Sequence, residues 1–207
     1  MGEGDKDSDL AWNEEYREKQ SSFGIFDIYS VTRVSPQGRR GSFILVDAAD
    51  WVTVVPLVKD AAGRDCFLMV RQFRHGNRKV TIEFPAGVIE RDEEPAEGAA
   101  RELLEETGRS AANLVLLGSS SPNPAFMTNA TYTFLATHLG PPDKQRLDAL
   151  EEVEIVTIPI DEVVASMGTK AYANSIMMAA LGYYLRWESW QEKSKGARRL
   201  GAFIAET

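Results

Sequence analysis

The fold of this chain is decided by one segment, Gly87-Val-Ile-Glu-Arg-Asp-Glu-Glu-Pro-Ala-Glu-Gly-Ala-Ala-Arg-Glu-Leu-Leu-Glu-Glu-Thr-Gly-Arg109. It predicts a loop followed by a helix. Pro95 suits the first helical position, where its missing N–H would have no partner, and Gly108 suits the residue past the end, where a positive φ is needed. Small and apolar residues fill one side of this helix. At about 100° per residue, the opposite side carries three glutamates, which are Glu102, Glu105 and Glu106.

This concentration of negative charge requires a compensating group. Neighbouring carboxylates on a helix repel one another by roughly 0.2–0.5 kcal/mol per pair, and Glu near a helix C-terminus opposes the macrodipole. A hard divalent cation such as Mg²⁺ would reverse this cost, because it prefers carboxylate oxygens and is often shared with substrate phosphates. Gly98, on the same side, would leave room for the metal or phosphate. The alternatives are a solvated acidic face with Arg101 as a local partner, and a tolerated surface glycine.

The spacing of the segment resembles the Nudix box, which reads Gly, five residues, Glu, seven residues, Arg-Glu-apolar-any-Glu-Glu-any-Gly-apolar. The matching residues are Gly87, Glu93, Arg101, Glu102, Leu103, Glu105, Glu106 and Gly108. The single departure is Arg109, which we expect just beyond the helix end, where a cation favours the last carbonyls.

The resemblance to the Nudix family implies an α/β fold, an α/β/α sandwich with a mixed sheet. It also implies Mg²⁺, or Mn²⁺ in its place, as cofactor. The implied metal ligands are the carbonyl of Ala86 and the carboxylates of Glu102, Glu105 and Glu106, with Glu105 also a catalytic candidate. The remaining box residues are structural by the same resemblance: Glu93 and Arg101 pair to hold the loop against the helix, between Gly87 and Gly108.

Two upstream motifs, Val70-Arg-Gln-Phe-Arg74 and Ile82-Glu-Phe-Pro-Ala-Gly87, resemble the Nudix subgroup that cleaves ADP-ribose and related nucleoside diphosphate sugars. The resemblance implies substrate contacts at Arg71, Glu83, Arg74 and Arg78. A guanidinium such as that of Arg71 suits a diphosphate, because it offers paired donors to phosphate oxygens; the alternative is an edge-strand arginine in a surface ion pair. Glu83 could accept from a ribose hydroxyl or bind metal.

A catalytic base must come from outside the helix if the helix carboxylates all bind metal. In related enzymes the loop that corresponds to Asp148–Glu154 supplies a glutamate to metal or water. Glu151 is the closest match, as base and metal ligand, and Glu152 is the alternative base. In an extended segment these two neighbours would point to opposite sides.

Aromatic and amide side chains are further candidates for substrate contact. Trp51 or Trp12 could stack on a purine, although packing explains either one equally well. In the segment 121–129, Asn123 replaces the Gly of the Ser-Pro-Gly found in many ADP-ribose pyrophosphatases, which favours broader nucleoside diphosphate sugar hydrolases. Asn123 and Asn129 would then bond sugar hydroxyls; the alternative is turn chemistry, for which Asn-Pro is well suited.

The rest of the pattern predicts four regions. Residues 1–20 read as a polar tail, 21–48 as a small antiparallel sheet, 49–194 as the Nudix hydrolase domain, and 195–207 as a polar C-terminal tail. A last helix is expected from Asn174 to about Lys193, with an apolar stripe that packs in the core or against a second subunit. The subgroup resemblance implies that the N-terminal sheet forms a homodimer.

Composition limits the partners. The 207 residues carry a formal net charge of −8, which argues against nucleic acid as the main partner because phosphate-backbone binding relies on Lys and Arg clusters. Cys66 is the single cysteine, so no disulfide forms within one chain, as is usual in a reducing compartment. No apolar run has the length of a membrane span or a signal peptide, and we expect a cytoplasmic protein without membrane contact.

The predicted function is metal-dependent hydrolysis of the diphosphate bond in nucleoside diphosphate sugars such as ADP-ribose, giving nucleoside monophosphate and sugar phosphate. Two alternatives stay open. One is a pyrophosphatase for dinucleoside polyphosphates or coenzyme A, and the other is a non-catalytic Nudix-fold ligand sensor. Loss of a box glutamate would mark the sensor, but Glu102, Glu105 and Glu106 are all present.

Overall fold

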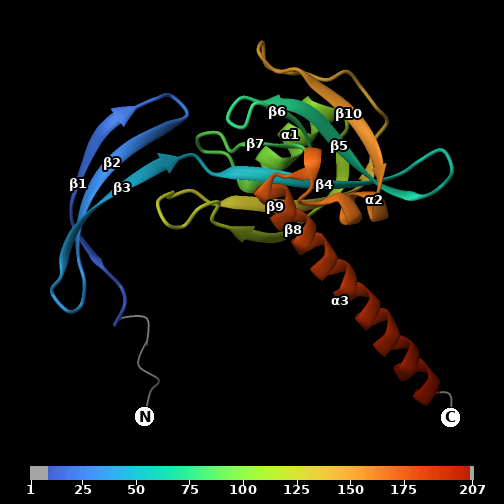
Figure 1. Cartoon of the computed structure of the whole chain (residues 1–207). Coiled ribbons are helices and arrows are strands. Elements are labelled where there is room, and N and C mark those ends of the chain that lie inside the picture. Colours follow the sequence, from blue (N-terminus) through green and yellow to red (C-terminus); the bar gives the residue numbers. More distant parts are fainter. Residues whose placement is uncertain (1–8, 206–207) are drawn as a thin grey trace. The chain divides into compact units, whose positions relative to one another are not determined.

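The computed structural model describes residues 9–205, with side chains as far as residue 193 except residue 192. These residues form two compact units (Figure 1). The first unit combines residues 9–50 with 121–130, and the second combines 51–120 with 131–205.

The first unit is a three-stranded antiparallel sheet in the order β1-β2-β3. Its strands are β1 (Asn13–Ser22), β2 (Phe26–Val34) and β3 (Arg40–Ala48). The segment 121–130 joins this sheet through a bridge between Val46 and Met127, where Val46 N donates to Phe126 O over 2.8 Å. Its buried apolar residues include Val31 and Leu45.

The prediction of a polar tail over residues 1–20 is wrong for the part that forms strand β1. Residues 1–8 lie outside the described part of the chain, but residues 13–20 are in a strand and not in a tail. Every residue of β1 is exposed, so the strand lacks the alternation of apolar and polar residues by which strands are recognised in a sequence. It is held by its backbone ladder with β2 and by cross-strand ion pairs such as Glu14 with Arg33, 3.1 Å apart.

The second unit is built on a seven-stranded mixed sheet with the order β10-β5-β4-β9-β8, in which β6 pairs with β5 and β7 with β4. The strands are β4 (Trp51–Lys59), β5 (Asp65–Arg74), β6 (Lys79–Glu83), β7 (Ala86–Val88), β8 (Ala111–Ser120), β9 (Thr131–Leu139) and β10 (Val153–Pro159). Strands β4 and β9 are parallel, and the other pairs are antiparallel.

Helices cover both faces of this sheet, because alternate residues of its central strands point to opposite sides. On one side Val52 and Val54 of β4 pack with Leu103 of α1 (Pro95–Thr107). On the other side Val55 and the neighbouring strands pack with α2 (Ile160–Ser166), the 3₁₀ turn η1 (Lys170–Tyr172) and α3 (Ser175–Ala205). The predicted α/β/α sandwich with a mixed sheet is therefore confirmed.

Helix α3 packs in the core, and it extends into the region where a polar C-terminal tail was predicted. The predicted apolar stripe packs in the core through Met177, Ala180, Leu181 and Tyr184, and Asn174 Oδ1 accepts from the backbone N–H of Ile176 at the helix start. The expected tail from residue 195 is wrong as far as Ala205, because the helix continues to that residue. Three Ala and two Arg residues between positions 195 and 205 favour helix.

The structure also bears on the single cysteine and on membrane crossing. Cys66 is a fully buried residue of β5, where it packs as a small hydrophobe. Within residues 9–205, no helix combines the length and the apolar character that crossing a membrane requires.

Candidate active site

Helix α1 is fixed at both ends by local signals. Pro95 occupies its first turn, and Glu94 and Glu97 form a reciprocal capping box in which the Glu94 N–H donates to Glu97 over 3.1 Å. Gly108 ends the helix with φ 64° and donates to Leu104 O over 2.8 Å. A Cβ at Gly108 would lie 1.9 Å from the carbonyl oxygen of Asp143, so both the backbone angle and the space require glycine.

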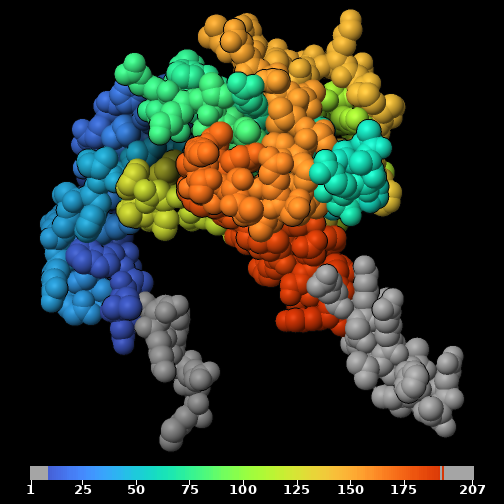
Figure 2. Space-filling model, turned by 45° about the vertical axis from the view of Figure 1, so that its right-hand side comes forward, coloured from blue at the N-terminus to red at the C-terminus, as the bar shows by residue number. Residues whose placement is uncertain are grey.

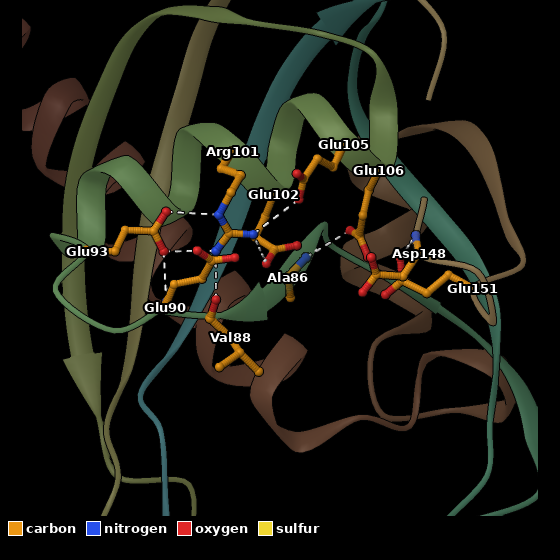
Figure 3. Close-up of polar contacts among 10 residues, drawn as sticks. All are labelled: Ala86, Val88, Glu90, Glu93, Arg101, Glu102, Glu105, Glu106, Asp148 and Glu151. Atoms are coloured by element: carbon orange, nitrogen blue, oxygen red, sulfur yellow. Dashed lines mark hydrogen bonds and ion pairs between the residues drawn. The ribbon is translucent and has the colours of Figure 1, made fainter. Parts of the chain in front are cut away.

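Arg101 holds the preceding loop against α1 (Figure 3). Its Nε and Nη2 donate to the two carboxylate oxygens of Glu93, each over 2.9 Å, and Nη2 also donates to Val88 O over 2.8 Å. The hydrogen bonds from Arg101 lower the pKa of Glu93. Gly98 faces this pair: a Cβ there would lie 3.0 Å from Glu93 Oε2. Gly98 therefore makes room for the Glu93 carboxylate, which corrects its expected role beside metal or phosphate.

The same guanidinium reaches two of the three clustered glutamates. Arg101 Nη1 donates to Glu102 Oε1 over 2.6 Å and to Glu105 Oε2 over 3.1 Å. On its other side Glu102 lies against strand β7, where a Cβ at Gly87 would be 2.1 Å from the Glu102 carboxylate carbon. Glycine at position 87 is thus what allows the β7 backbone to approach this carboxylate.

Glu106 is the most deeply buried acid of the helix, with 4% of its surface exposed. Its Oε2 accepts from the backbone N–H of Ala86 over 3.0 Å. Burial raises the pKa of Glu106 to about 8; the Ala86 hydrogen bond opposes this rise, and the charges of Glu102 and Glu151 add to it. Burial, with added repulsion from Glu105 and Glu151, also raises the pKa of Glu102. A cation near these carboxylates would lower both pKa values.

In the loop before β10, the side chains of the neighbours Glu151 and Glu152 have different surroundings. Glu151 N donates to Asp148 O over 2.9 Å, and Asp148 N donates to Glu151 Oε2 over 3.1 Å, so the side chain folds back over its own turn. The charge of Glu151 acts on both Glu102 and Glu106, and Figure 3 shows it at the end of α1 that carries Glu106. Glu152 instead lines a cavity of about 490 Å³ together with Arg71.

A larger cavity, of about 550 Å³, is lined in part by strand β7. Its lining includes Trp51, Arg74, Glu83, Ala86, Gly87 and Ser175. Strand β7 therefore serves two sites, because Ala86 and Gly87 line the cavity and also contact Glu106 and Glu102. A ligand in this cavity would contact the strand whose backbone meets Glu102 and Glu106.

In the wall of the larger cavity, the partly exposed Arg74 pairs with the buried Glu83. Arg74 Nη2 donates to Glu83 Oε2 over 2.6 Å, and the Thr81 hydroxyl donates to Glu83 Oε1 over 2.7 Å. Glu83 is fully buried. Burial opposes its charged form, but Arg74 and the hydrogen bonds outweigh this effect and lower the pKa of Glu83. Glu83 thus orients Arg74, since both its oxygens are already occupied.

Arg71 and Arg78 lie away from this pair. Arg71 Nη1 donates to Glu154 over 2.8 Å and lines the smaller cavity, which is the surface ion pair given above as its alternative. Because side chains alternate along β5, Arg71 and Arg74 point to opposite sides of the strand. Arg78 is exposed in the turn after β5, with φ 57° and its N–H bonded to Arg74 O over 2.8 Å.

Three other candidates have structural contacts within the first unit. Asn123 Oδ1 accepts from Ala125 N over 3.3 Å, which is the turn chemistry given as its alternative. Asn129 is 2% exposed and donates to Ala49 O over 3.2 Å. The ring of Trp12 packs edge-on against Phe43, with centroids 5.5 Å apart. All three side chains therefore stabilise the first unit.

Residues that the sequence did not suggest also border the site. Asn174 and Ser175, at the start of α3, line the larger cavity. Gln145 contacts the end of α1: its Nε2 donates to Glu106 O over 2.6 Å. An isolated glutamine in a polar segment carries no sequence signal for such a contact.

An α/β/α sandwich that presents an acidic helix beside a substrate-sized cavity is the architecture of a Nudix hydrolase. Residues 50–178 match the family model described as NUDIX domain, and the chain belongs to this family. It is 27% identical over 176 residues to the ADP-ribose pyrophosphatase of Bacillus subtilis (strain 168), covering 84% of this chain and 93% of the relative. It is also 27% identical over 159 residues to the methanol dehydrogenase activator of Bacillus methanolicus, covering 76% and 84%.

Solved structures agree on the fold. A crystal structure described as ADP compounds hydrolase superposes with a TM-score of 0.75, at 22% identity, over 87% of this chain and 95% of that chain. The chain is therefore a Nudix hydrolase by family and by fold.

Nudix hydrolases generally use divalent metal ions, and the donors present here fit such an ion. Within residues 9–205, no three acidic, His or Cys side chains are gathered closely enough to hold a metal by themselves. The carboxylates of Glu102 and Glu106 are nevertheless buried together with raised pKa values, and Glu151 adds a third charge. All are oxygen ligands of the kind that Mg²⁺ prefers, and substrate phosphates would complete the coordination.

Proposed function

We propose that this Nudix hydrolase cleaves the diphosphate bond of nucleoside diphosphate sugars such as ADP-ribose, with Mg²⁺ or Mn²⁺ as cofactor. The observation that carries the proposal is the double role of β7. Its residues Ala86 and Gly87 line the 550 Å³ cavity and also contact the carboxylates of Glu106 and Glu102. A diphosphate held there would have its charged centre beside the acidic helix and its two ends in the cavity.

The cofactor would be held by Glu102, Glu105, Glu106, the carbonyl of Ala86, and Glu151. When bound, such an ion neutralises phosphate oxygens and makes hydroxide available near neutral pH. Glu105 and Glu102 are paired with Arg101 in the structure, so that side chain balances part of their charge.

The protein's own residues would perform three tasks. Glu151 accepts the proton of the attacking water, whose oxygen bonds to one phosphorus while the bond from that phosphorus to the bridging oxygen breaks. The products are a nucleoside monophosphate and a sugar phosphate. Arg74, held in place by Glu83, donates to the diphosphate, and Trp51 offers an aromatic face in the cavity wall to the base.

The relatives support the substrate class. The B. subtilis protein, which this chain matches over 93% of its length, is described as an ADP-ribose pyrophosphatase. The upstream motifs that contain Arg74 and Glu83 are also the ones that resemble this subgroup. We therefore place ADP-ribose first among the substrates to be tested.

Homodimer formation through the first unit belongs to the same proposal. Its sheet exposes apolar side chains, with Phe23 61%, Ile25 79% and Ile44 57% exposed. A second subunit could cover these side chains. Light scattering after size-exclusion chromatography measures the mass directly, and a monomeric mass at micromolar concentration would contradict the dimer.

The function is tested by a product screen with added Mg²⁺ over ADP-ribose, UDP-glucose, GDP-mannose, diadenosine polyphosphates and coenzyme A. Chromatography should identify a nucleoside monophosphate and a sugar phosphate from one or more of the first three. Glu106→Gln should abolish cleavage, whereas Glu97→Gln, which preserves the capping box at the far end of α1, should not. If folded protein cleaves none of the five, the enzyme proposal is wrong.

A further inference from the structure

The segment 140–146 is tied to the C-terminal end of α1 by a series of hydrogen bonds. Arg109 Nη1 donates to Gly140 O over 2.9 Å, and Asp143 N donates to Gly108 O over 2.8 Å. Further along, Arg146 N donates to Glu105 O over 2.9 Å. The bonds to Gly108 O and Glu105 O satisfy backbone carbonyls that the helix end leaves without partners.

Gln145 differs from the other residues of this segment because its side-chain amide donates two hydrogen bonds. Nε2 donates to Glu106 O over 2.6 Å and to Val153 O over 3.2 Å. Glu106 is in the last turn of α1, and Val153 is the first residue of β10. One amide group therefore joins the helix that carries the clustered glutamates to the strand that follows Glu151.

The loop between these ties, residues 147–152, has few other constraints. It lies on the surface of the second unit, within the gold segment of Figure 2, and all of its residues except Leu147 are exposed. Its internal contacts are the two hydrogen bonds between Asp148 and Glu151. They shape the turn, but they do not fix its position relative to α1.

We propose that Gln145 is a positioning residue, which sets the approach of Glu151 to the carboxylates of α1. This inference rests on the proposed function, in which Glu151 is the base. Gln145 lines neither cavity and is expected to act on turnover and not on substrate binding. Groups that orient a reacting residue typically contribute about 10–100-fold to activity.

The first test is the replacement Gln145→Met, which keeps the length of the side chain and removes both donors. With ADP-ribose and saturating Mg²⁺, kcat should fall about 10–100-fold while KM stays within about threefold. The matched control is Arg109→Met, which removes one hydrogen bond between the same segment and the helix end but none to β10. A kcat loss of equal size in both variants would show a general structural effect and overturn the proposal.

The second test combines Gln145→Met with Glu151→Gln. Because Gln145 acts through Glu151, the double variant should be no slower than Glu151→Gln alone. Losses that multiply would show that Gln145 acts by another route. If Glu151→Gln keeps full turnover, the proposed base is wrong, and the positioning proposal falls with it.

A third measurement does not depend on activity. Amide hydrogen exchange of residues 147–152 in metal-free protein should become faster in Gln145→Met and not in Arg109→Met. Unchanged exchange in folded Gln145→Met would overturn the proposal even if substrate cleavage has never been detected. Faster exchange without loss of kcat would show a tether with no role in catalysis, which also contradicts it.

Discussion

Replacement of Gly87 by alanine tests how closely strand β7 approaches the acidic helix. The added Cβ would lie 2.1 Å from the carboxylate carbon and 2.1 Å from Oε1 of Glu102. Ordinary carbon contacts are about 3.5–4.0 Å, so the carboxylate would have to move by more than about 1 Å. Its 2.6 Å hydrogen bond from Arg101 would be lost in that movement.

Displacement of a proposed metal ligand by this distance should lower kcat by about 100-fold, and overpacking should cost about 1–3 kcal/mol in the free energy of unfolding. Steady-state kinetics with ADP-ribose and urea unfolding measure the two effects. Gly182→Ala is the matched control, because a Cβ there meets no atom within 4 Å and alanine favours the helix. If Gly87→Ala turns over within about twofold of the wild type, the close approach of β7 to Glu102 has no catalytic importance.

Three further predictions concern the helix and its surroundings. Gly108→Ala should lower the free energy of unfolding by about 1–3 kcal/mol, because a positive φ and the Asp143 carbonyl 1.9 Å away both exclude a Cβ; a urea midpoint equal to that of the wild type would contradict this. The folded pKa of Glu93 is lowered by Arg101, so its pairing stabilises the fold above the unfolded pKa of about 4.3 and this stability is lost as pH falls through the folded value. Urea unfolding from about pH 6 to about pH 3, which spans the carboxylate titration, should therefore show a weaker acid dependence in Glu93→Gln. Mg²⁺ at about 100 times its Kd should stabilise the protein by about 2.7 kcal/mol and raise Tm by roughly 5–10 °C, whereas Glu106→Gln should lose most of this rise and Glu97→Gln should keep it.

The parts of the fold that depend on local signals could be predicted from the sequence. The bounds of α1 follow from Pro95 and Gly108, whose backbone requirements need no knowledge of distant residues. The core stripe of α3 follows from helical periodicity. Strand β1 could not be predicted in this way, because its residues are all exposed and its contacts are with residues distant in the sequence, chiefly its ladder with β2.

In the candidate site, too, the features set by local sequence could be predicted, and those set by distant contacts could not. The spacing of Glu102, Glu105 and Glu106 places them on one helix, but only the sheet register distinguishes Arg74, which lines the larger cavity, from Arg71 on the opposite side of β5. Glu151 and Glu152 are neighbours in the sequence, and the fold distinguishes them: the charge of Glu151 acts on Glu102 and Glu106, whereas Glu152 lines the smaller cavity.

Long-range contacts are the least predictable. Gln145 joins Glu106 to Val153 across segments far apart in the chain, and nothing in its own neighbourhood indicates this. Gly98 was expected to make room for a ligand, whereas it makes room for Glu93. In both cases the role of the residue depends on a contact made only in the folded chain.

The most direct test of the central claim compares Glu151→Gln with Glu152→Gln in Mg²⁺-dependent cleavage of ADP-ribose. The two residues are neighbours, both are exposed, and both substitutions remove one charge. Glu151→Gln should lower kcat by about two to four orders of magnitude, because the base is lost, while Glu152→Gln should stay within about threefold of the wild type. Equal turnover of the two variants, or a larger loss in Glu152→Gln, would contradict the assignment of Glu151 as the base.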